Sequence, residues 1–131
     1  MPAAATTREV SRACLWFGLF GGALAWTIHF MSAYAVAEFG YVGGLDERSF
    51  GSISLVAWLE LALTAAGLLV AAAATAVARR SQRRLLSSAH NTGAAGEAER
   101  HTARAGLFTS GIFTFVILFE SIPIFFYLCS C

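Results

Sequence analysis

The sequence predicts an all-α membrane protein with three transmembrane helices, and its composition and its apolar patterning support that prediction. Hydrophobic residues make up 57 % of the 131 residues and charged residues only 13 %, against about 25 % charged residues in soluble domains. The apolar residues gather into runs at 13–37, 53–78 and 105–128. Each run exceeds the roughly 20 residues that a helix needs to cross a bilayer. The composition therefore argues against a soluble globular domain.

Each of the three runs is expected to be a helix, and together they form a single domain over residues 1–131. Inside a bilayer only helices and closed barrels satisfy their own backbone hydrogen bonds, and three segments cannot close a barrel. Residues 35–37 have the A-x-A form of a signal-peptide cleavage site, but the first run is longer than the usual ~7–15 apolar residues of such a peptide. The segment 79–104 is expected to be a polar loop, with Arg79 to Arg84 extending the second helix.

The arginines predict the orientation of the chain in the membrane. Lysine is absent, and all nine basic residues are arginine. Two arginines precede the first run and six lie in the segment 79–104, whereas the segment between the first two runs holds one. Because positive residues stay in the cytoplasm, we expect a multi-pass membrane protein with a defined orientation. Its N-terminus and second loop face the cytoplasm, and its C-terminus lies outside. Contact with anionic lipid or with an acidic partner is the alternative role for these arginines.

Each predicted helix carries one ionisable residue within its apolar run: His29, Glu60 and Glu120. At about 1.5 Å of rise per residue, all three fall roughly 10–12 Å below the outer surface. Ionisable groups at that depth are costly and usually face the interior of a bundle or a cavity. We therefore expect an intramembrane polar cluster in which the three side chains point away from lipid.

Small residues accompany this cluster and predict where the helices pack. Gly18 and Gly22 form a G-x-x-x-G pair on the His29 side of the first run, and Gly67 lies on the Glu60 side of the second. Glycines at such spacing allow helix backbones to approach closely. The sequence thus predicts that the ionisable residues lie where helices meet.

Three interpretations of the polar cluster remain open. It could bind a metal or haem, although one histidine and two glutamates are an incomplete ligand set for most metals. It could conduct protons, or it could form hydrogen bonds between helices and to a partner subunit. We favour the last interpretation. No nucleophile–base pair or cofactor motif predicts an enzyme, and the net charge of +1 argues against nucleic-acid binding.

The chain ends in Cys129-Ser130-Cys131. The predicted topology places this motif outside the cytoplasm, where disulfides are permitted. Two exposed thiolates could bind copper(I). We favour free thiols or a disulfide to a partner, because two ligands alone are a weak copper site.

Two segments carry a resemblance to a known family. Residues 16–29 read WFGLFGGALAWTIH, and residues 120–123 read ESIP before an apolar stretch that ends in cysteine. These segments resemble small three-helix bacterial membrane proteins whose genes often lie near those of haem-copper cytochrome c oxidases. The resemblance implies a place in the bacterial inner (cytoplasmic) membrane and association with a respiratory complex, whose larger subunits hold haem or copper.

The function expected from these observations is that of a non-catalytic accessory subunit. It would pack against larger subunits of a respiratory membrane complex, a haem-copper terminal oxidase or its supercomplex, and it would contact lipids. It would bind no cofactor alone, although it could contact haem or copper held by a partner. One alternative is an oxidase assembly or copper-delivery factor that uses Cys129 and Cys131. The other is a small proton or ion channel formed by self-association.

Overall fold

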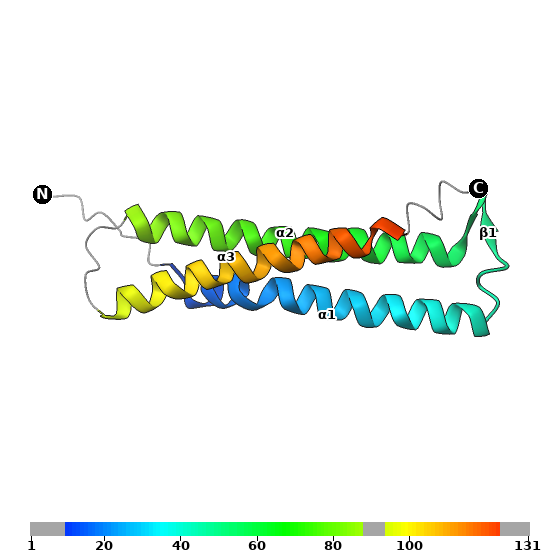
Figure 1. The fold of residues 1–131 in the computed structure, drawn as a ribbon, viewed down its shortest axis with the longest axis horizontal. Coiled ribbons are helices and arrows are strands. Elements are labelled where there is room, and N and C mark those ends of the chain that lie inside the picture. The colour runs from blue at the N-terminus through cyan, green and yellow to red at the C-terminus, as the bar shows by residue number, and fades with distance from the viewer. Residues whose placement is uncertain (1–9, 88–93, 124–131) are drawn as a thin grey trace, which may run out of the picture.

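The computed structural model describes residues 10–87 and 94–123, without the side chains of residues 94 and 95. It contains three long helices: α1 (Arg12–Val42), α2 (Leu55–Ser87) and α3 (Ala94–Glu120). They run lengthwise beside one another as an elongated bundle (Figure 1), and each helix contacts the other two. All three are long and apolar enough to span a membrane. The prediction of three membrane-length helices is therefore confirmed.

The helices extend further than the apolar runs that predicted them. α1 continues to Val42 and α2 to Ser87, so the expected extension of the second helix through Arg79–Arg84 is confirmed. α3 begins at Ala94, and the predicted loop over 79–104 was therefore too long. Hydropathy marks only the apolar part of a helix, whereas arginine, glutamate and alanine in the flanking segments also favour helix. Residues 124–128 of the predicted third helix lie outside the described residues.

A short hairpin that the sequence did not predict joins α1 to α2. Strand β1 (Ser49–Phe50) pairs antiparallel with β2 (Ile53–Ser54) at one end of the bundle (Figure 1). Gly51 adopts a positive φ of 71° in the turn, a conformation that favours glycine. The Ser54 hydroxyl accepts a hydrogen bond from the backbone N–H of Ala57 at 3.2 Å, which caps the first turn of α2.

Small residues form the centre of the bundle, and their contacts bring the backbones together. A Cβ placed on Gly18 would lie 3.0 Å from the Cβ of Ala78, and one placed on Gly22 would lie 2.6 Å from the Cα of Ser110. A Cβ on Gly106 would lie 3.0 Å from the backbone of Gly18. The hydroxyl of Ser110 donates a hydrogen bond to the carbonyl oxygen of Gly18 at 2.6 Å. The G-x-x-x-G pair of α1 therefore packs inside the bundle, against α2 and α3.

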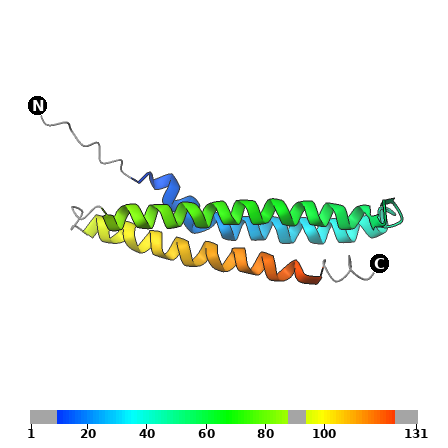
Figure 2. The same cartoon turned by 90° about the horizontal axis from the view of Figure 1, so that it is seen from above.

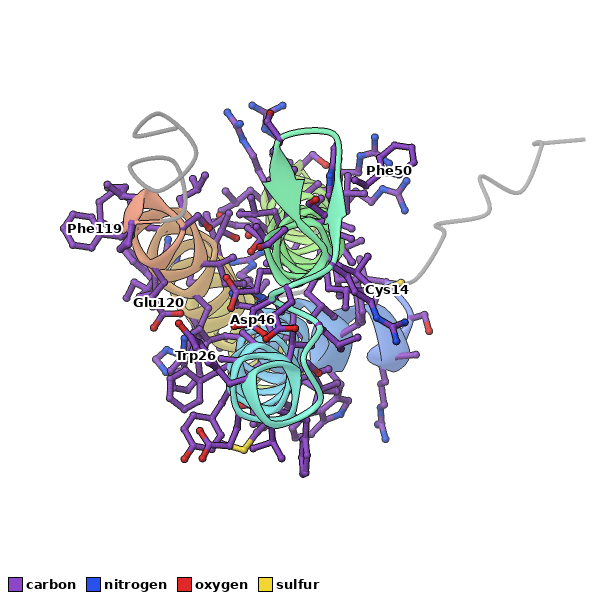
Figure 3. All side chains as sticks on the ribbon, turned by 90° about the vertical axis from the view of Figure 1, so that its right-hand side faces the viewer. Cys14, Trp26, Asp46, Phe50, Phe119 and Glu120 are labelled. Carbon is purple, nitrogen blue, oxygen red and sulfur yellow. The ribbon has the colours of Figure 1, made fainter. Side chains whose placement is uncertain are left out.

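Large apolar side chains lie mainly on the outside. Viewed from above, α3 lies along one side of the α1–α2 pair (Figure 2), and side chains such as Phe119 point away from the bundle (Figure 3). Among the described residues, Ile117 is the largest side chain that is fully buried. This arrangement, with small residues inside and large ones outside, is typical of helices that associate in lipid. The exposed large apolar side chains include Trp16, Phe20, Leu24, Ile28, Met31, Leu69, Phe108, Ile112, Phe115 and Phe119.

Gly22→Ala is expected to destabilise the bundle. The added methyl group would overlap the α3 backbone at Ser110, and overpacking of this kind costs about 1–3 kcal/mol. Reversible unfolding of the purified chain in mixed detergent micelles would measure the loss.

The matched control is Gly111→Ala, because nothing lies within 4 Å of a Cβ at Gly111. That variant should be as stable as the parent chain or more stable, because alanine favours helix over glycine by about 1 kcal/mol. Equal losses in the two variants would contradict this account of the packing.

Candidate functional site

The three ionisable residues of the predicted cluster line one cavity of about 340 Å³. His29 comes from α1, Glu60 from α2 and Glu120 from α3. Thr64 and Tyr34 line the same cavity. Because Tyr34 and Glu120 are exposed, the cavity opens on the outer surface of the bundle. We call this feature, defined by these five residues, the polar groove.

His29 occupies the buried side of the polar groove. Its side chain is only 7 % exposed, as predicted from its place among small residues. Gly67 makes room for it, because a Cβ at that position would lie 3.2 Å from the Cβ of His29. The imidazole Nδ1 is buried, and it has no hydrogen-bond partner among the described residues. Position 29 thus combines tight packing with an unsatisfied polar atom.

Thr64 is the second buried polar residue of the groove, one turn after Glu60 on α2. Its hydroxyl oxygen also lacks a partner among the described residues. Four other helix threonines donate to the carbonyl oxygen four residues earlier, which satisfies their hydroxyls locally: Thr27, Thr75, Thr102 and Thr114. A buried polar group without a partner costs about 1–3 kcal/mol. Within the described residues, the groove therefore holds two such groups, on His29 and Thr64.

Glu60 and Glu120 differ in their surroundings. Glu60 is half-buried on α2 and lines the same cavity as His29. Glu120 is exposed in the last turn of α3, and the expectation that all three groups point away from lipid stays a prediction. Ile117 is on the buried face of α3, and Ser121, directly after the helix, is buried as well. Glu120 adjoins Ser121 in the chain but lies about 100° further round the helix, at the rim of the groove.

Trp26 holds Glu120 in place. Its indole N–H lies 3.2 and 3.1 Å from the two carboxylate oxygens of Glu120 and donates a hydrogen bond to them, and the two side chains point toward one another (Figure 3). The Trp26 ring also packs against Phe113 of α3, with 5.4 Å between ring centroids. The bond between Trp26 and Glu120 was not predicted from the sequence. The sequence indicated such a bond only indirectly, because a tryptophan within an apolar run needs an acceptor for its N–H.

Metal binding is one of the interpretations of the polar cluster and of the C-terminal cysteines. Within residues 10–87 and 94–123, no three histidine, cysteine, aspartate or glutamate side chains are grouped so that they could hold a metal ion. Cys129 and Cys131 lie outside the described residues. The polar groove instead offers two carboxylates, one imidazole and two hydroxyls. These groups suit a hydrogen-bonding or cationic group that enters from the side of the bundle.

Comparison with known proteins adds no family to this description. No protein-family model, no curated protein and no solved structure matches the chain. The features of the chain that bear on its function are therefore the residues of the polar groove and the surface around it.

A double-mutant cycle should show that Trp26 and Glu120 are coupled. Trp26→Phe and Glu120→Ala each remove one side of the hydrogen bond, so the double variant should lose less stability than the sum of the single losses. We expect a coupling of about 0.6–1.7 kcal/mol, the range for hydrogen bonds between membrane helices. Unfolding in mixed micelles would measure it.

The matched control for this cycle is Trp58→Phe with Glu120→Ala. The indole N–H of Trp58 donates to the carbonyl oxygen of Phe50 at 3.4 Å, not to Glu120. These two substitutions should therefore be additive. An additive result for the Trp26 pair as well would show that its hydrogen bond contributes nothing to stability.

Proposed function

We propose that the chain is a non-catalytic accessory subunit of a respiratory membrane complex, which it joins by helix packing. One observation carries the proposal: the polar groove opens on the outer surface while two of its buried polar atoms, on His29 and Thr64, lack partners in the described chain. Polar groups inside membranes pair with groups on neighbouring helices. A helix of a larger subunit, seated on the groove, would bring a donor and an acceptor to the cavity that His29 and Thr64 line.

The surface around the groove supports the same proposal. Phe30 and Tyr34 line the groove and are exposed. Phe119, beside Glu120, points outward (Figure 3). Aromatic residues are enriched where protein surfaces associate. The chain also buries few large side chains of its own, so binding to a partner would add stability that the small core does not supply.

The identity of the partner and the orientation in the membrane are further parts of the proposal. The resemblance carried by residues 16–29 and 120–123 favours a haem-copper terminal oxidase, or its supercomplex, in a bacterial inner membrane. The arginine distribution favours a cytoplasmic N-terminus and an external C-terminus. The partner would hold the haem and copper, and this chain would contribute helix surface and hydrogen bonds.

Native purification tests the proposal directly. The tagged full-length chain, solubilised from its own membrane in a mild detergent, should elute with larger subunits that show the absorption spectrum of haem. Association through satisfied polar groups should survive high salt, because buried pairs are screened much less than surface charges. A chain that elutes alone, with no haem-containing subunit under any mild extraction, would overturn the proposal.

His29→Leu separates a role in partner binding from a role in folding. Leucine removes the unpartnered Nδ1, so the isolated chain should keep its stability or gain some. Recovery of the partner should nevertheless fall about tenfold, which corresponds to ~1.4 kcal/mol, because the partner's group loses its acceptor or donor. Quantitative mass spectrometry of the purified complex would measure recovery.

Met31→Leu is the matched control for this experiment. Met31 is exposed on the same helix, two residues later, and does not line the polar groove. Its substitution should change neither stability nor recovery. If His29→Leu instead destabilised the isolated chain and left recovery unchanged, the groove would serve only the chain's own fold.

A further inference from the structure

A second groove lies between α2 and α3, toward the end of the bundle that holds the arginines of α2. It encloses about 430 Å³, and its lining includes Arg79, Arg80 and Arg83 together with Thr75 and Thr114. We propose that this arginine groove binds an anionic phospholipid, with the lipid phosphate held by the guanidinium groups. The proposal is independent of the partner complex.

The three guanidinium groups are available for a ligand. Arg79 and Arg80 are exposed neighbours on α2, and Arg83 follows one turn later. None of the three forms an ion pair with another described residue. Three like charges that share one groove repel one another, so an anion among them lowers the electrostatic energy. Guanidinium groups bind phosphate oxygens through paired hydrogen bonds, which makes phosphate the anion that suits them best.

The rest of the groove has a different chemistry. Two alanines of α2, Ala72 and Ala76, form an apolar wall of the groove toward the middle of the bundle. The hydroxyl oxygens of Thr75 and Thr114 lie 3.2 Å apart and join α2 to α3. Each also lies within hydrogen-bond distance of the carbonyl oxygen four residues earlier. The hydroxyls are thus satisfied within the protein and leave the ligand an apolar surface below the arginines.

The division of the groove into an apolar part and a charged part favours a phospholipid over a soluble anion as its ligand. Arg79 directly follows the apolar run 53–78, so the groove spans the boundary between the apolar and the charged parts of α2. A soluble phosphate would use only the arginines. A phospholipid places its phosphate among the arginines and an acyl chain along the alanines, and so matches both parts.

Native mass spectrometry of the delipidated full-length chain tests the proposal. Phosphatidylglycerol and phosphatidylcholine with the same acyl chains would be titrated in separate and mixed experiments. We expect phosphatidylglycerol to bind about tenfold more tightly, and excess inorganic phosphate to leave its binding unchanged. Equal binding of the two lipids, or displacement of phosphatidylglycerol by inorganic phosphate, would overturn the proposal.

Variants locate the binding. Arg79→Gln and Arg83→Gln should each weaken phosphatidylglycerol binding about fivefold, as expected for ~1 kcal/mol per arginine near an anionic lipid. Ala76→Leu should also weaken it, because the larger side chain fills the groove and leaves every charge in place.

Arg84→Gln is the matched control: it makes the same change in charge on the same turn of α2, but Arg84 does not line the groove. It should leave binding unchanged. If Arg84→Gln weakened binding as much as Arg79→Gln, or if Ala76→Leu had no effect, the lipid would be held by diffuse charge and the proposed site would not exist.

Discussion

The close approach of helix backbones at glycine is the constraint on which the rest of this structure depends. Gly18 and Gly22 of α1 face Ala78 and Ser110 with no room for a further carbon atom, and the hydroxyl of Ser110 donates to the carbonyl oxygen of Gly18. This contact fixes how far α1 lies from α2 and α3. Two turns beyond Gly22, it leaves His29 pressed against Gly67. The position of the buried imidazole is therefore a consequence of backbone packing.

The same constraint explains why the bundle has a groove of opposite charge toward each end. Small residues bring the three backbones together along the middle of the bundle, where little side-chain volume remains to be filled. Larger polar side chains do not fit between these backbones, and they lie on the outer faces of the helices. Glu60 and Glu120 line one such opening, whereas Arg79 and its neighbours line the other. Glu60 and Glu120 thus line a different groove from Arg79, Arg80 and Arg83.

Much of the fold could be predicted, because helix formation in a membrane depends on local sequence. A run of more than 20 apolar residues has few other structures available in lipid, and the number of helices followed from that alone. The ends of the helices did not follow. The segment that begins at Ala94 is polar, so hydropathy does not distinguish it from a loop, although its residues favour helix. The hairpin at Ser49–Ser54 is too short to show a strand pattern.

The sequence by itself determined the all-α class with three membrane-length helices, and it determined the three ionisable positions. The reason is that the free-energy cost of placing a side chain in hydrocarbon depends on its residue type. Helical phase was enough to place His29 inside. Only the tertiary structure decided that Glu120 lies at the rim, that Trp26 is its donor, and that Thr64 has no hydrogen-bond partner among the described residues. Those outcomes depend on the rotation of one helix about its axis relative to another. Side-chain packing sets that rotation across residues that are far apart in the chain.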